Sequence, residues 1–125
     1  MKSDALAREM RGLRDHVAGI TDTMVAAVDG MLIAADMADD MDPEGLAALA
    51  AAGLGVAQRT VGAAGRGELR RIMTYGSHGC TAVYAIRDIA LMVVLGDEGL
   101  NAEHLHRESR AAVDRIGSIL LGSAP

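Results

Sequence analysis

The 125 residues are enough for one domain, and half of them are apolar, so the chain can bury a sizeable core. A net charge of −5 with no run of basic residues argues against binding to DNA, RNA or an anionic membrane surface. The lack of Trp and Phe argues against a stacking platform for single-stranded nucleic acid, and the single cysteine excludes an internal disulfide. We expect one acidic, cytoplasmic domain over residues 1–125, with no signal peptide at its N-terminus.

Residues 3–18 carry the clearest helical pattern in the chain. Apolar side chains recur every three or four residues on one face, and charged side chains occupy the other. The apolar set is Leu6, Met10, Leu13 and Val17. Two short apolar runs follow, TDTMVAAV and MLIAA, and Asp29-Gly30 between them predicts a hairpin with a type I′ turn.

An acidic stretch, DMADDMD, leads into a segment that we expect to form a helix from about residue 43 to residue 64. Asp42 is the expected cap, and Pro43 suits the first helical position because its missing N–H costs nothing there. Within this helix, the sequence GLAALAAAGLGVA contains no charge, hydroxyl or amide. That stretch is shorter than the about 20 apolar residues that span a bilayer, so we expect no direct membrane insertion.

The second half predicts three more strands and a closing helix over 101–121. The run ELRRIMTY carries charges that suit an edge strand, CTAVYAI follows a turn, and IALMVVL is apolar throughout, as in a central strand covered on both faces. The element order is α-β-β-α-β-β-β-α. The short connections predict an α/β (α+β) fold with a mostly antiparallel sheet between helices on both faces.

The uncharged helix raises the question of what covers its two faces. The residues expected against the sheet are Leu46, Leu49, Ala50, Gly53, Val56 and Thr60. The opposite face is small and apolar, and two glycines inside a helix, each costing about 1 kcal/mol, ask for a packing reason. An Ala-rich helix that tolerates solvent is the simpler alternative, but we expect a two-fold dimer that also joins two edge strands. The expected interface consists of Ala47, Ala48, Ala51, Leu54, Gly55, Gln58, Arg71 and Met73.

Catalytic motifs are missing from the sequence. The only lysine is Lys2, which excludes a phosphate-binding loop with its lysine and a Schiff-base lysine. His78 and Cys80 resemble a base and a nucleophile, but a buried thiol beside a turn histidine is the favoured interpretation. Arg66 and Arg87 are interpreted as surface residues rather than arginine fingers. We expect no enzyme and no cofactor.

Two groups of residues resemble metal ligands at first sight. His104 and Glu108 share a helix face but His106 points away from it, so we expect a solvated helix start rather than a metal site. The acidic residues Asp36, Asp39, Asp40 and Asp42 lack the spacing of a calcium-binding loop. They are expected to form an exposed loop, with an acidic docking site for a basic partner as the functional alternative.

The order of these elements, together with VAAVDGMLIAAD, LAALAAAGLGVAQR, GELRRIMTYG and IALMVVL, resembles the roadblock/LC7 family over nearly the whole chain. The resemblance implies a five-stranded antiparallel sheet with the middle helix on one face and the terminal helices on the other. It also implies homodimers built through the middle helix and the third strand. Family members act as scaffolds and as regulators of Ras-like GTPases, including bacterial ones that stimulate GTP hydrolysis.

Two functional hypotheses follow from the resemblance. The first is a non-enzymatic, dimeric regulator of a small Ras-like GTPase in a bacterial signalling system, which stimulates GTP hydrolysis by remodelling the GTPase. The alternative is a scaffold that docks a sensor-kinase-like or motility partner without affecting nucleotide turnover. An enzyme built on His78 and Cys80 is a distant third.

Overall fold

The computed structural model describes residues 2–38 and 41–122. Within these ranges the elements follow the predicted order α-β-β-α-β-β-β-α. The strands form one five-stranded antiparallel sheet with the order β2-β1-β5-β4-β3. The elements are α1 Lys2–His16, β1 Ile20–Ala27, β2 Leu32–Met37, α2 Pro43–Ala63, β3 Arg71–Gly76, β4 Gly79–Ile86, β5 Ala90–Gly96 and α3 Ala102–Leu120.

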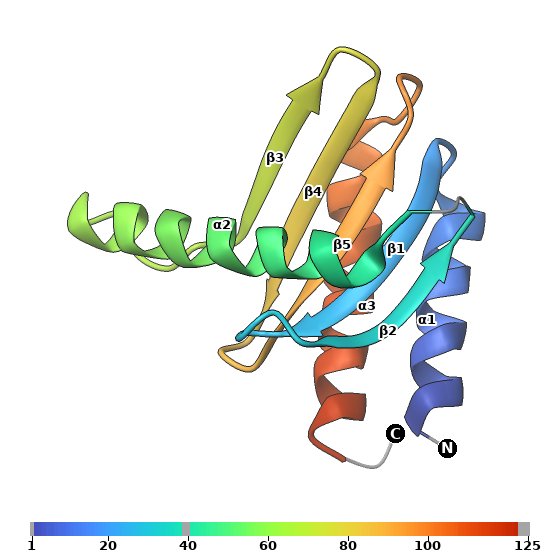
Figure 1. Cartoon of the computed structure of the whole chain (residues 1–125), viewed down its shortest axis with the longest axis horizontal. Helices are drawn as coiled ribbons and strands as arrows, with labels where there is room; N and C mark the ends of the chain where they lie inside the picture. The colour runs from blue at the N-terminus through green and yellow to red at the C-terminus, as the bar shows by residue number, and fades with distance from the viewer. Residues whose placement is uncertain (1, 39–40, 123–125) are drawn as a thin grey trace.

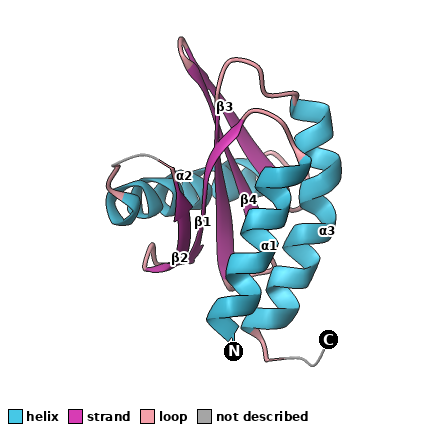
Figure 2. Cartoon of the chain, turned by 90° about the vertical axis from the view of Figure 1, so that its right-hand side faces the viewer, coloured by secondary structure: helices cyan, strands magenta, loops and turns pink. Residues whose placement is uncertain are grey.

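The sheet separates two helical layers, as the resemblance implied. Figure 1 shows α2 crossing one face of the sheet, and Figure 2 shows α1 and α3 side by side on the other. Each layer buries its own apolar cluster against the sheet because successive strand residues point to opposite faces. The α1–α3 side contains Leu6, Met10, Leu105 and Ile116, and the α2 side contains Ala47, Leu54, Leu91 and Val93.

The strand β5 lies at the centre of the sheet, between β1 and β4. Leu91 and Val93 pack on the α2 side, whereas Met92 and Val94 pack on the α1–α3 side. All four side chains are 3% exposed or less. The structure therefore confirms the prediction that the uninterrupted apolar run IALMVVL is a central strand with cover on both faces.

The β1–β2 hairpin forms as predicted, but its turn differs in type. The Gly30 N–H donates to the Ala27 carbonyl (2.9 Å), and the Ala27 N–H donates to the Met31 carbonyl (2.9 Å), so the loop holds three residues rather than two. A type I′ turn requires a positive φ at both Asp29 and Gly30. Gly30 has φ +92°, but Asp29 is not among the described residues with positive φ. The Asp29 carboxylate instead accepts a hydrogen bond from the Met31 N–H (3.0 Å).

The two long helices after β1 begin differently. The side chain of Asn101 caps α3 by accepting a hydrogen bond from the His104 N–H (2.9 Å). Asp42 occupies the corresponding position before α2, but its side chain makes no capping hydrogen bond. Its carboxylate lies against Gly45, and only its backbone carbonyl accepts a helical N–H, that of Leu46 (3.2 Å). The predicted side-chain cap at Asp42 is therefore wrong, although the helix begins at Pro43 as expected.

Candidate functional site

One face of α2 packs on the sheet, and it is the face that the sequence predicted to contact a second chain. Ala47 and Leu54 are buried in the α2-side core, at 0% and 3% exposure, and Ala51 packs against the same cluster. Leu49 and Val56, which were expected inside, are 71% and 56% exposed. The assignment of the two faces is thus wrong for these residues.

A close approach between α2 and the β1–β2 hairpin explains this orientation. A methyl group added at Gly30 would lie 3.2 Å from the Cα atom of Ala48 and 3.5 Å from the Cβ atom of Ala51. The alanines therefore let α2 approach its own hairpin rather than a second chain. Leu46 and Ala50, also expected inside, do pack against this core. Because the stretch has no charge, only side-chain size could indicate which face packs on the sheet. Size predicts the wrong face for Leu49 and Val56, which are exposed.

The outer surface of α2 remains apolar, and residues 2–38 and 41–122 do not cover it. Two predicted interface residues lie at its margins, Gly55 half-buried and Gln58 exposed. Figure 1 shows that the distal end of α2 projects beyond the edge of the sheet at β3. The exposed residues of this outer surface, called the α2 outer face below, are Leu49, Ala52, Gly53, Val56 and Thr60.

The length of α2 changes one expectation about membranes. At 21 residues the helix is longer than its uncharged stretch, and its length and composition are those of a segment that could cross a bilayer. The length argument against membrane insertion therefore fails for the whole helix. A helix packed on a sheet can meet the same criteria, however, and Ala47 and Leu54 would have to leave the core before α2 could insert.

The strand β3 forms the edge of the sheet, as predicted. Arg71 pairs with Tyr84, and Met73 packs against the cluster on the α1–α3 side. Ile72, which points the other way, packs against the α2-side cluster. The side chains of Arg71 and Met73 therefore do not share a surface with the α2 outer face. Only the free backbone edge of β3 is common to both sides of the sheet.

The geometry around Cys80 does not resemble an activated nucleophile. His78 lies in the turn before β4 with its side chain 94% exposed, and its Nδ1 atom is 4.0 Å from Glu98. Cys80 is half-buried beside Gly96. Burial and the nearby Asp97 charge both raise the pKa of the Cys80 thiol, which lowers the fraction of reactive thiolate. These observations favour the interpretation of Cys80 as a structural thiol.

The other chemical candidates are also placed by the structure. Arg87 has φ +53° in the β4–β5 turn, and its guanidinium lies over Gly117 and donates to Ser118 Oγ (3.4 Å). Arg66 is exposed in the loop after α2. Among the described residues no three potential ligands gather for a metal ion.

The acidic stretch is divided between the described and undescribed parts of the chain. Asp36 belongs to β2 rather than to a loop, and its carboxylate lies 3.5 Å from Arg14 Nε. Asp42 directly precedes α2. Asp39 and Asp40 lie outside the described residues, so the acidic docking site stays a prediction.

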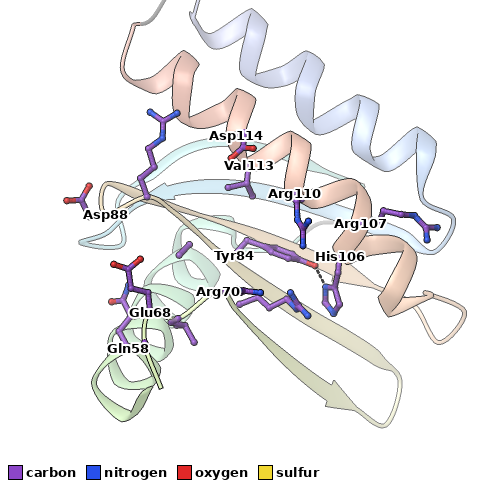
Figure 3. A pocket seen from close by; sticks show the side chains of 15 residues that line it. Gln58, Glu68, Arg70, Tyr84, Asp88, His106, Arg107, Arg110, Val113 and Asp114 are labelled. Atoms are coloured by element: carbon purple, nitrogen blue, oxygen red, sulfur yellow. Dashed lines mark hydrogen bonds between the residues drawn. The ribbon is translucent and has the colours of Figure 1, made fainter. Parts of the chain in front are cut away.

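A groove of about 1300 Å³ opens between α3, the β3–β4 pair and the segment that leads into β3, and it reaches Gln58 of α2 and the β4–β5 turn (Figure 3). Tyr84 lies on its floor, where the phenol is 2.6 Å from Nδ1 of His106. Five arginines and three carboxylates line the groove. The arginines are Arg70, Arg71, Arg87, Arg107 and Arg110, and the carboxylates are Glu68, Asp88 and Asp114.

The contact between Tyr84 and His106 is a bond between neutral groups at neutral pH. Burial raises the pKa of the Tyr84 phenol, although neighbouring Ser109 and Arg71 partly oppose this. Burial, followed by the charge of Arg71, lowers the pKa of His106. The contact therefore joins a neutral phenol to a neutral imidazole, and which group donates depends on which ring nitrogen carries the proton.

The sequence alone does not reveal this groove, because its parts are distant in the chain. Tyr84 is in β4 and His106 is in α3, and His106 was assigned to a solvated helix start. The pair Arg107 and Arg110 was a usable signal, since residues three apart lie on the same face of a helix. Adjacent arginines at the start of a strand were the second signal.

Comparison with known proteins gives one family. The Roadblock/LC7 domain model matches residues 6–96. An uncharacterized protein of Methanocaldococcus jannaschii, MJ0310, is 34% identical over 98 residues, which cover 78% of this chain and 85% of that protein.

Solved structures give the same fold at low sequence identity. An MglB with a tetrameric arrangement superposes with a TM-score of 0.90 at 14% identity, covering 98% of this chain and 93% of that one. The gliding protein MglB of Thermus thermophilus superposes with a TM-score of 0.88, also at 14% identity and with the same coverage of 98% and 93%.

Proposed function

The chain belongs to the Roadblock/LC7 domain family, and from that premise we propose that it is a non-enzymatic, homodimeric regulator of a small Ras-like GTPase. The proposal places it in the cytoplasm, within a bacterial signalling system. Regulation would act by stimulating GTP hydrolysis through remodelling of the GTPase. Because the Arg87 guanidinium is held against α3, the proposal assigns it no role as an arginine finger.

The observation that carries the homodimer is the uncovered α2 outer face, and the regulatory role is proposed from the family. Leu49 and Val56 are 71% and 56% exposed, and small residues surround them. Burying side chains of this kind contributes about 1.5–3 kcal/mol each. In a two-fold dimer the same surface is buried on both copies, so each side chain contributes twice. A second copy of the chain would therefore bury this apolar face on both protomers at once.

The free edge of β3 supports the same assembly. An unpaired edge presents backbone N–H and C=O groups that can pair with another strand. The distal end of α2 projects past this edge, over the place that an added strand would occupy (Figure 1). Pairing two β3 strands would extend the sheet and give each projecting helix a surface to pack on. Self-association also has a structural precedent, since one MglB of the same fold has a tetrameric arrangement.

The dimer is tested by the native mass across a dilution series. We expect the wild-type protein at twice 13.0 kDa and the Leu49→Arg variant at 13.0 kDa, because a charge on the α2 outer face would be desolvated in the dimer. Leu121→Arg is the matched control, since Leu121 is 55% exposed at the end of α3. A wild-type monomer at micromolar concentration, or a dimer unaffected by Leu49→Arg, would refute the assignment.

The regulatory step is tested with the small Ras-like GTPase encoded nearest to this chain's own gene. Single-turnover GTP hydrolysis is measured with no addition, with wild-type protein and with Leu49→Arg. We expect acceleration by the wild type and a loss of that acceleration in the variant. Binding without any change in turnover would favour the scaffold that docks a sensor-kinase-like or motility partner. If the protein neither binds this GTPase nor accelerates its GTP hydrolysis, the choice of this GTPase is refuted.

A further inference from the structure

The groove between α3 and the β3–β4 pair holds positive charge that the described chain does not neutralise. The ion pairs within 4.0 Å in residues 2–38 and 41–122 involve Arg14, Arg115 and His78, none of which lines this groove. The lining holds five arginines and three carboxylates, an excess of two positive charges in a chain of net charge −5. Such a local excess of positive charge attracts negatively charged groups.

Four of these arginines come from two opposite walls of the groove. Arg107 and Arg110 lie one turn apart on α3, and Arg70 and Arg71 lie where the chain enters β3. Figure 3 shows Arg110 near Tyr84, whereas Arg107 points away from the Tyr84–His106 pair. The neutral pair of Tyr84 and His106 lies on the floor between these walls. The groove thus has an uncharged floor and walls in which arginines outnumber carboxylates.

We propose that this groove, called the arginine groove below, binds an acidic peptide segment of a protein partner. Guanidinium groups bind carboxylates through paired hydrogen bonds, which matches arginines on both walls. A volume of about 1300 Å³ exceeds the about 300–1,000 Å³ of sites for compact ligands and suits an extended segment. The first turn of α3 is not part of the lining, so the groove lacks the helix N-terminus that commonly binds phosphate.

This inference goes beyond the proposed regulation of a GTPase and does not rest on it. The helix α3 lies on the side of the sheet opposite α2 (Figure 2), although the arginine groove also reaches the entry to β3 and Gln58 of α2. An acidic segment can therefore bind along α3 while a second copy covers the α2 outer face. Changes at Arg107 and Arg110 are expected to leave the native mass unchanged, which separates failure of this inference from failure of the dimer.

The test uses a fluorescein-labelled peptide of four Glu-Ser repeats and measures its anisotropy with the full chain at two salt concentrations. We expect binding that weakens as salt rises, since screening acts on exposed charges. The double variant Arg107→Glu and Arg110→Glu should lose at least tenfold in affinity. The matched control is Arg8→Glu with Arg11→Glu, which makes the same charge change at the same spacing on the exposed side of α1.

Several results would overturn the proposal. Equal losses in the two double variants would mean that net charge alone attracts the peptide. Equal binding of a Gln-Ser peptide would mean that carboxylates are not recognised, and displacement by pyrophosphate at the same charge concentration would indicate a compact anion site. Absence of wild-type binding at low salt would also refute it. Arg70→Gln, on the opposite wall, should weaken binding severalfold, and circular dichroism checks that each variant is folded.

Discussion

On one face of the sheet α1 and α3 lie side by side, whereas α2 crosses the other face alone (Figure 2). The outer surfaces of α1 and α3 are charged, and that of α2 is apolar. The first pair is linked on the outside, where Arg115 Nε donates to a Glu9 carboxylate oxygen (2.7 Å). The outside of α2 carries Leu49 and Val56 instead. The α1–α3 layer and the α2 layer both bury apolar residues against the sheet, so their inner faces are alike. Their outer faces differ, because that of α1 and α3 is suited to water and that of α2 is suited to contact with another protein surface.

The largest expected effect contrasts the two faces of α2. Leu54→Ala should lower the free energy of unfolding by about 2–5 kcal/mol, because Leu54 is 3% exposed in the core. Leu49→Ala should leave the protomer's stability nearly unchanged and alter only how the midpoint depends on protein concentration. Urea denaturation followed by circular dichroism at several protein concentrations measures both. Similar losses for the two variants at every concentration would contradict the orientation of α2.

A smaller effect separates the starts of α2 and α3. Asn101→Ala removes the hydrogen bond to the His104 N–H and should destabilise the protein by about 1 kcal/mol. Asp42→Ala removes no side-chain capping bond, so its effect should stay within about 0.5 kcal/mol, the range of ordinary surface substitutions. Thermal unfolding of the two variants under identical conditions makes the comparison. A larger loss for Asp42→Ala than for Asn101→Ala would break it.

The smallest expected effect is a pH dependence on the α3 side. The folded protein lowers the pKa of His106, so the unfolded chain takes up this proton first as the pH falls below about 6.5. The stabilising contribution is therefore fully present above that pH and is lost as the pH falls through the lower folded pKa. His106→Gln should flatten the dependence in urea denaturation between pH 5 and 8, whereas His104→Gln should retain it. An unchanged slope in His106→Gln would refute this origin.

The strands were predictable because their pattern depends on burial alone. The run IALMVVL has no polar position, as in a central strand, and ELRRIMTY carries charges that suit an edge, although β3 begins only at Arg71 and leaves Glu68 and Arg70 before it. The amphipathic helices were predictable for the same reason, since α1 and α3 mark their outer faces with charge. The orientation of α2 was not, because its side chains differ in size but not in polarity. Its inner face is set by the approach of Gly30 to Ala48 and Ala51, which is a tertiary contact.

The candidate site was less predictable than the fold. The outer surface of α2 was recognised as an unusual feature, but its residues were assigned to the wrong side. The arginine groove was missed because it combines β4, α3 and the entry to β3, and no local pattern reports that Tyr84 meets His106. The positive charge of the groove was not predictable either. Arginines that are scattered along an acidic chain are interpreted as solvated residues, and only the fold shows that they lie in one groove.

The order of strands in the sheet has a consequence for synthesis on the ribosome. The strand β1 pairs with β5, and Ile20 lies opposite Gly96. The middle of the sheet therefore cannot form until β5 has been synthesised. The helix α2 is made well before β5, and at about 5–20 residues per second the delay is on the order of seconds. During that time α2 has only the β1–β2 hairpin to cover its inner face. The nascent chain therefore passes through a period in which chaperone protection of residues 43–63 is most useful.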